Sequence, residues 1–233
     1  MIVLDGLSVR RGGYVLTADV SIPQGVTALI GASGSGKSTL LEAMAGFIAP
    51  QAGQMLVDGR DITALPPADR PVSILFQERN LFAHLTLAEN VGLGVAPDLR
   101  LSRAERVRIA GVLERVGLSG LDMRRPGEVS GGQRQRAAIA RAVLRQRRVL
   151  LLDEPFAALG PALRHQMLDL VAEIVAAEDM VSVLVSHTPE DAMRIAPLTG
   201  FLGSGQLCGL HATTDLLRNP PPELAAYLGS ARQ

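Results

Sequence analysis

Large aromatic rings are scarce in this sequence: it has no tryptophan, and aromatic residues make up only 3% of its 233 residues. A folded interior must therefore be built from valine, isoleucine and leucine, which favours buried parallel strands covered by helices. Cysteine is equally scarce. Because Cys208 is alone, no internal disulfide is possible, and without a Cys-His spacing the sequence gives no sign of a zinc site.

Net charge is absent as well, since 23 basic side chains balance 23 acidic ones. Nucleic-acid binders usually carry a basic surplus or stripe, so we expect no nucleic-acid partner. The arginines between residues 134 and 148 alternate with apolar residues, which favours a solvated helix face. The sequence also lacks a signal peptide and any run of 18 apolar residues, so we expect a cytosolic protein that can still dock on a membrane protein.

Lysine occurs once, at Lys37, among the 23 basic residues. It lies in a G-x-x-x-x-G-K-[ST] loop, whose backbone N–H groups surround the α- and β-phosphates of a nucleotide. The lysine of such a loop reaches the β- and γ-phosphates, where a compact ammonium fits and a wide guanidinium does not. We therefore predict a nucleotide site at Gly31, Ala32, Ser33, Gly34, Ser35, Gly36, Lys37, Ser38 and Thr39, with the Ser38 hydroxyl on Mg²⁺.

The elements around this loop are predicted in the order that it requires. Gly25–Ile30 is a short apolar β run, and the helix predicted over Lys37–Gly46 turns three residues inward, namely Leu40, Leu41 and Met44. The helix N-terminus would place partial positive charge beneath the phosphates.

The rest of the chain alternates between strand and helix patterns. We predict strands over Met55–Gly59, Val72–Phe76, Val149–Asp153 and Val181–Ser186, and a helix that starts at Pro161. Between about 78 and 140 the periodicity is helical, and it includes a capping box, Ser102-Arg-Ala-Glu105. We expect one domain over residues 1–233, an α/β fold with a parallel sheet and a helical subdomain inserted at about 78–140.

Two carboxylates follow the apolar strand that ends at Asp153. Asp153 lies at its carboxyl end, where it can hold Mg²⁺ through water beside Ser38. Glu154 points elsewhere and can orient or deprotonate an attacking water. The alternative is that the two acids only solvate the end of a strand.

A second predicted helix N-terminus could also bind phosphate, because a serine and two glycines precede the helix. Its residues are Ser130, Gly131, Gly132 and Gln133. It cannot serve the same nucleotide as the first loop. Ser130 is locally compatible with an ordinary N-cap as well. Taken together with Gln77, Asp153-Glu154 and His187, however, this segment resembles the signature of the ATP-binding cassette (ABC) ATPase family, and the resemblance covers nearly the whole chain.

The resemblance implies a P-loop NTPase core with a parallel sheet, a small antiparallel β part and an inserted α-helical subdomain. It also implies a head-to-tail dimer that sandwiches two ATP molecules, in which the Ser130 segment of one copy caps the ATP on the Lys37 loop of the other. By the same resemblance, Gln77 contacts Mg²⁺ and the attacking water, and His187 contacts the γ-phosphate as a switch histidine.

Two positions depart from the family pattern. Gly160 stands where the family usually has an aspartate that contacts the other subunit, so cross-dimer coupling is in doubt; we expect hydrolysis to survive with slower turnover. The usual aromatic residue that stacks on adenine is replaced by a segment in which either Tyr14 or Arg11 can stack. We take Tyr14 as the candidate.

A single cassette without a membrane span resembles the ATPase subunit of a bacterial importer. Residues 66–90 are most similar to thiamine importer ATPase subunits; iron(III), polyamine and sulfate importers, or a soluble non-transport cassette ATPase, are the alternatives. The implied partners are a second copy, integral-membrane permease subunits and, indirectly, a periplasmic substrate-binding protein. The implied location is the cytoplasmic face of the bacterial inner membrane.

Overall fold

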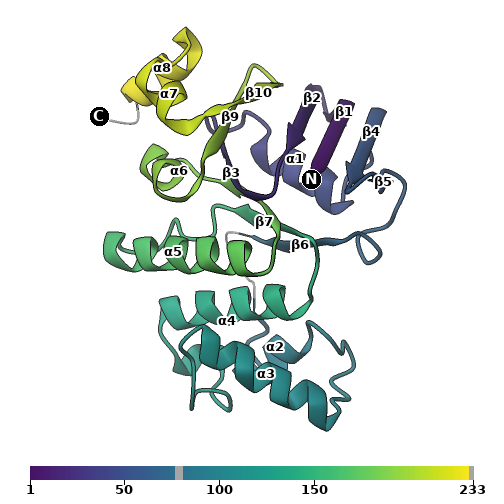
Figure 1. The fold of residues 1–233 in the computed structure, drawn as a ribbon, viewed down its shortest axis with the longest axis vertical. Coiled ribbons are helices and arrows are strands. Elements are labelled where there is room, and N and C mark those ends of the chain that lie inside the picture. Colours follow the sequence, from purple (N-terminus) through teal and green to yellow (C-terminus); the bar gives the residue numbers. More distant parts are fainter. Residues whose placement is uncertain (77–80, 231–233) are drawn as a thin grey trace.

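The computed structural model describes residues 1–76 and 81–230, and its strands form one ten-stranded sheet (Figure 1). The sheet order is β5-β4-β1-β2-β10-β9-β3-β8-β7-β6. The strands are β1 (Ile2–Arg11), β2 (Tyr14–Ile22), β3 (Gly25–Ile30), β4 (Ala52–Val57), β5 (Arg60–Asp61), β6 (Val72–Leu75), β7 (Val149–Asp153), β8 (Val181–Val185), β9 (Leu198–Gly203) and β10 (Gln206–Ala212).

Eight α-helices accompany the sheet within the described ranges. They are α1 (Lys37–Ala45), α2 (Leu87–Gly92), α3 (Arg103–Arg115), α4 (Gly131–Leu144), α5 (Pro161–Ala177), α6 (Pro189–Ile195), α7 (Thr213–Arg218) and α8 (Pro222–Ser230), with a 3₁₀ turn at Pro126–Glu128. None of the helices in these ranges is long and apolar enough to cross a membrane.

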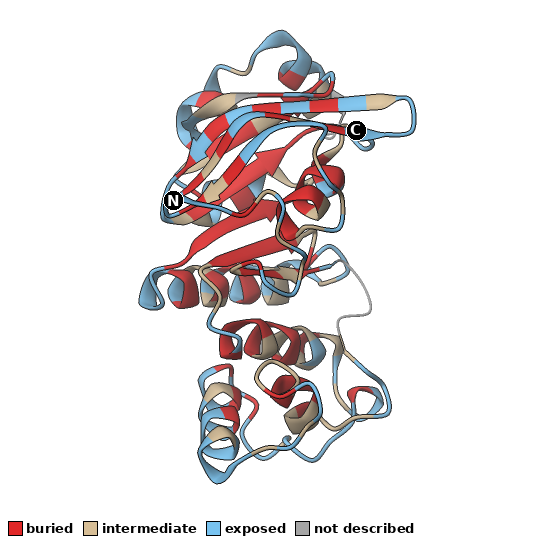
Figure 2. Ribbon diagram, turned by 90° about the vertical axis from the view of Figure 1, so that its right-hand side faces the viewer, coloured by how far each residue is buried: buried red, intermediate tan, exposed pale blue. Residues whose placement is uncertain are grey.

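The centre of the sheet is parallel, as predicted. Strands β3, β8, β7 and β6 pair in parallel, whereas β1, β2, β4 and β5 pair antiparallel and join the same sheet through β10. The two kinds of strand differ in burial (Figure 2): β8 is buried along its whole length, while β2 alternates between buried and exposed residues. This is the pattern expected when helices cover both faces of the parallel strands and only one face of the antiparallel ones.

Strand β7 divides the core into two layers. Leu150 and Leu152 belong to the cluster formed with α2, α3, α4 and α5, whereas Leu151 belongs to the cluster formed with α1, β1 and β2. Because successive side chains of a strand point to opposite faces, one apolar strand supplies both clusters.

The helices of the predicted insertion lie together at one end of the molecule (Figure 1). They are α2, α3 and α4, and α4 continues to Leu144, past the predicted limit of about 140. The capping box is present as predicted: Ser102 accepts from the Glu105 backbone N–H, and Glu105 accepts from that of Ser102. The assignment of residues 1–233 to one domain with this insertion stays a prediction.

The two ends of the chain hold elements that the sequence reasoning did not resolve. The hairpin of β1 and β2 forms the antiparallel part that only the family resemblance implied, and β9 and β10 return to pair with β3 and β2. The last helices pack on the sheet through a small cluster of Ile30, Leu216 and Leu224.

Helix α1, which starts at Lys37, is anchored at its other end by a buried arginine. Arg70 is 2% exposed, and its guanidinium donates to four backbone carbonyl groups, those of Ala43, Met44, Thr63 and Leu65. Two of these, those of Ala43 and Met44, are among the last carbonyls of α1, and that of Ala43 also accepts from the Gly46 N–H that caps the helix. Burial lowers the pKa of Arg70, and the charge of Asp61 opposes this shift.

We predict that Arg70→Met lowers the free energy of unfolding by about 3 kcal/mol, because it leaves several buried carbonyl groups without donors. Chemical denaturation measures the loss. Arg11→Met is the matched control: Arg11 also bonds to α1, through Glu42 at 2.6 Å, but on the exposed surface. Such a pair contributes below about 1 kcal/mol. Equal losses in the two variants would contradict the anchoring role of Arg70.

Candidate functional site

The predicted phosphate-binding loop joins β3 to α1 and is shaped by its glycines. Gly34 and Gly36 have φ values of 79° and 100°, which glycine adopts without strain. A side chain at Gly36 would also collide with its neighbours, since an added Cβ would lie 2.7 Å from Leu16 Cδ1 and 3.1 Å from a Tyr14 ring carbon. Both the backbone angle and the lack of space therefore require glycine at position 36.

The Lys37 ammonium lies over the loop that precedes it. Its Nζ donates to the carbonyl oxygens of Gly31 at 2.7 Å and Ala32 at 2.8 Å, and the residue is 4% exposed. Burial lowers the pKa of Lys37, while the nearby carboxylates of Glu154 and Asp153 oppose the shift. A buried cation held by neutral carbonyls can exchange them for a stronger anionic partner.

Two hard oxygen donors meet beside the loop. The Ser38 hydroxyl donates to Asp153 Oδ1 at 3.1 Å. Burial raises the pKa of Asp153, whereas the Ser38 hydrogen bond and the charges of Lys37 and His187 lower it. No group of three or more His, Cys, Asp or Glu residues that could hold a metal occurs in residues 1–76 and 81–230. The hydroxyl of Ser38 and the carboxylate of Asp153 are donors that fit Mg²⁺, which usually binds one or two protein oxygens together with waters and substrate phosphates.

Glu154 and His187 are in direct contact. His187 Nε2 lies 2.5 Å from Glu154 Oε1, although the two residues follow different strands, β7 and β8. Glu154 has φ 47°, an uncommon value for a residue with a side chain, and its N–H donates to Val185 O at 3.1 Å. Strained backbone held in place by neighbouring structure is a feature of functional sites.

A cavity of about 180 Å³ brings eight of the predicted residues together. It is lined by Ser33, Gly34, Gly36, Lys37, Ser38, Thr39, Glu154 and His187. A phosphate chain on the loop would thus face both the carboxylate of Glu154 and the imidazole of His187. Gln77, predicted to contact Mg²⁺ and water, lies outside the described residues.

The predicted signature segment does not line this cavity. Ser130 is the N-cap of α4: its Oγ accepts from the Gln133 N–H at 3.2 Å, and Gln133 Oε1 accepts from the Ser130 N–H at 2.8 Å. An ordinary helix cap therefore explains the local geometry. The helix start nevertheless remains exposed at Ser130, as a surface that meets a second molecule must be.

Tyr14 lies against the loop. Its hydroxyl donates to Ser35 O at 2.6 Å, and its ring borders Gly36. Arg11, the other candidate for stacking, is paired with Glu42. The stacking of Tyr14 on adenine stays a prediction, and its hydrogen bond to the loop was not foreseen.

Gly160 is the N-cap of α5 and has φ −63°, an ordinary value for any residue. Within the part of the chain that the structure describes, no atom lies within 4 Å of a Cβ added there. An aspartate would therefore fit at this position without strain, and its absence from this chain is not required by the fold.

The sequence reasoning missed a partly buried ion pair near His187. Arg164 on α5 is paired with Asp191 on α6, and the Ser186 hydroxyl donates to the same carboxylate at 2.6 Å. Ser186 in turn accepts from the Thr188 N–H at 3.0 Å. These bonds fix the backbone on both sides of His187, but no sequence pattern brings residues 164 and 191 together.

Comparisons with known proteins agree with this geometry. The sequence profile of the ABC transporter family matches residues 17–157. The thiamine import ATP-binding protein ThiQ of Cereibacter sphaeroides is 54% identical and covers 98% of this chain and 100% of its own length. Its counterpart in Brucella suis is 52% identical, covering 97% of this chain and 96% of its own length.

Solved structures show the same fold. A nucleotide-free ATP-binding cassette from an ABC transporter superimposes with a TM-score of 0.86 at 24% identity, over 94% of this chain and 96% of its own. A dimeric ATP-binding cassette in a post-hydrolysis state, bound to ADP and Pi, gives a TM-score of 0.77 at 25% identity, over 91% and 99%. The sequence matches and the fold together show that this chain belongs to the ABC transporter family and is its ATP-binding cassette.

Proposed function

We propose that this protein is the ATP-hydrolysing subunit of a bacterial thiamine importer and that it works as a head-to-tail homodimer. One observation carries the hydrolytic part: a single cavity holds the phosphate loop, Glu154 and His187. The substrate rests on a different observation, the full-length similarity to thiamine import ATP-binding proteins. No residue of the site offers a physical reason to select a vitamin, so specificity belongs to the partners.

In the proposed mechanism the loop binds the phosphates of ATP through its backbone N–H groups and through Lys37. The ammonium would leave the carbonyls of Gly31 and Ala32 for the β- and γ-phosphate oxygens. A charge-assisted bond to phosphate is stronger than one to a neutral carbonyl, so this exchange favours binding. It also fixes the γ-phosphate in the cavity that Glu154 and His187 line.

Glu154 and His187 would then act on the attacking water and the γ-phosphate. Glu154 Oε1 faces His187 Nε2, and the other carboxylate oxygen would accept a proton as the water oxygen attacks phosphorus. The bond from the γ-phosphorus to the bridging oxygen of ADP breaks. His187 would donate from Nε2 to the γ-phosphate oxygens, where negative charge is greatest.

Mg²⁺, when bound, would neutralise phosphate charge. Ser38 and Asp153 would hold it, with Gln77 as a further ligand. The direct Ser38–Asp153 bond keeps both oxygen donors at one place in the site.

The partners follow from the same proposal. The Ser130 segment of a second copy would cover the ATP on the Lys37 loop, so two copies complete two sites. The dimer would dock on integral-membrane permease subunits at the cytoplasmic face of the inner membrane, with a periplasmic binding protein delivering substrate. Closure of the dimer on ATP would drive the permease, and hydrolysis would reopen it.

We predict that Mg-ATP protects Lys37 from an amine-reactive reagent. The chain has only one other amine, that of Met1, which pairs with Asp58 on the exposed surface and serves as an internal control. Peptide mass spectrometry should show that Mg-ATP lowers labelling of Lys37 and leaves labelling of Met1 unchanged. Lys37 that is labelled without nucleotide and labelled to the same extent with Mg-ATP would be excluded from the phosphate site.

The transport assignment is tested by measuring ATP hydrolysis in membranes reconstituted with this protein, its permease subunits and its substrate-binding protein. Thiamine should stimulate ATP hydrolysis, and Glu154→Gln should abolish at least about 99% of it, because the water loses its proton acceptor. Iron(III) and polyamines are the comparison substrates. Stimulation by one of them, and not by thiamine, would contradict thiamine as the substrate. Hydrolysis at the same rate with and without the permease would contradict a role in transport.

A further inference from the structure

The C-terminal helix α8 brings a tyrosine to His187. The hydroxyl of Tyr227 donates to the backbone carbonyl of His187 at 3.1 Å and lies 3.5 Å from Nδ1 of the same residue. On the opposite edge of the ring, Nε2 lies 2.5 Å from Glu154 Oε1. The imidazole is therefore held between the end of β7 and a helix near the end of the chain.

The contacts favour one orientation of the ring. The single hydroxyl hydrogen of Tyr227 is donated to the His187 carbonyl, so its oxygen is the acceptor that faces Nδ1. The carboxylate of Glu154 is the acceptor that faces Nε2. A half turn of the ring about its Cβ–Cγ bond would replace both nitrogens by carbons at these positions. Tyr227 and Glu154 thus favour the same ring orientation from two sides.

We propose that Tyr227 is a positioning residue for His187: it orients the imidazole ring so that the Nε2–H bond points into the ATP site. The inference rests on the proposed role of His187 at the γ-phosphate and adds the residue that orients it. Tyr227 itself does not line the cavity that holds the phosphate loop.

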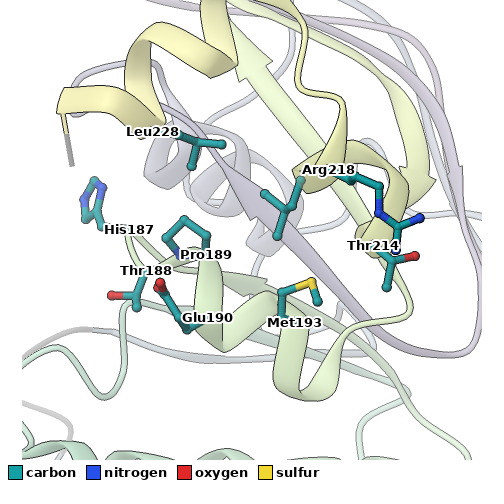
Figure 3. A pocket seen from close by; sticks show the side chains of 9 residues that line it. His187, Thr188, Pro189, Glu190, Met193, Thr214, Arg218 and Leu228 are labelled. Carbon is teal, nitrogen blue, oxygen red and sulfur yellow. The ribbon is translucent and has the colours of Figure 1, made fainter. Parts of the chain in front are cut away.

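Packing alone does not fix the ring. His187 borders a second pocket of about 410 Å³ between α6, α7 and α8 (Figure 3), and 39% of its side chain is exposed. In the figure the imidazole stands at the rim of this pocket, with Leu228 of α8 above it and Met193 of α6 on the far side. Because open space adjoins the ring, hydrogen bonds have to supply the orientation.

Helix α8 is anchored well enough to hold Tyr227 in place. Leu224 is fully buried with Ile30 and Leu216, and the Ser204 hydroxyl donates to Glu223 Oε1 at 3.1 Å. Burial raises the pKa of Tyr227, and the charge of Glu154 raises it further, so the hydroxyl keeps its proton at neutral pH. The donor that the proposal needs is therefore present.

Tyr227→Phe tests the proposal, because it keeps the ring and removes only the hydroxyl. We expect kcat for ATP hydrolysis by the complete transporter to fall about threefold to tenfold, the effect of losing one hydrogen bond in the transition state, with KM for ATP within about twofold. Ser204→Ala is the matched control: it removes a hydrogen bond to the same helix away from His187, and both kinetic constants should stay unchanged.

The second readout is the orientation of the His187 ring, seen in ¹H–¹⁵N correlations of the imidazole nitrogens. The chain has four histidines, and His187→Gln assigns the signal. We expect wild type and Ser204→Ala to give one set of His187 ring signals, and Tyr227→Phe to give a second set from the ring in its other orientation. This measurement does not depend on hydrolysis.

The outcomes separate this inference from the proposed function. An active transporter whose kcat and His187 signal are unchanged by Tyr227→Phe would refute the positioning role and leave the proposed function intact. Equal changes in Ser204→Ala would also refute it, because helix packing would then be the cause. If the wild-type transporter did not hydrolyse ATP, the proposed function itself would be contradicted.

Discussion

The parallel register of β3, β7 and β8 is the constraint on which the rest of the site depends. Val185 of β8 is paired with Leu29 of β3 on one side and with Asp153 of β7 on the other. The residues that follow these positions must therefore emerge at one edge of the sheet, and they include the phosphate loop, Glu154 and His187. A slip of one residue in any of these strands would turn its buried side chains to the wrong layer. The apolar core on both faces thus fixes the chemistry at the edge.

The polar groups at this edge are paired with one another. Lys37 is held by loop carbonyls, the Ser38 hydroxyl by Asp153, and His187 by Glu154. Because unpaired buried charges are costly, each group needs such a partner. In the proposed mechanism ATP binding exchanges these partners for phosphate oxygens, so the fold bears no large cost of unpaired charge before or after the exchange. Arg164 and Asp191 fix the backbone beside His187, and the proposed role of Tyr227 would fix its ring.

Local patterns made much of this architecture predictable. The strand over Gly25–Ile30 and the helix that begins at Lys37 were predicted from a continuous apolar run and a loop with its own chemistry. Strand β7 and the capping box at Ser102 were predictable for the same reason, since each signal lies within a few residues. The position of Asp153 and Glu154 beside the phosphate loop was predicted from the end of an apolar strand, whereas that of His187 was predicted only from the family resemblance.

Contacts between distant segments were not predictable. Nothing in the sequence near Tyr227 indicates that α8 returns to His187, and nothing pairs Arg164 with Asp191. Tyr14 was predicted to face a base, and its bond to Ser35 depends on how β2 meets the loop. Strands β9 and β10 were not predicted, because glycines interrupt their apolar pattern. Their positions in the sheet are set by pairing with the distant strands β3 and β2.

The most direct test of the central claim, a site shared by two copies, is complementation between two inactive variants. Lys37→Ala removes the phosphate contact, and Ser130→Arg blocks the exposed start of α4. Each variant alone should fail to hydrolyse ATP. In a head-to-tail dimer, half of a random mixture pairs one copy of each, and each pair holds one intact site, so about a quarter of wild-type activity should return. A mixture as inactive as its components would contradict the shared site, as would full activity of Ser130→Arg alone.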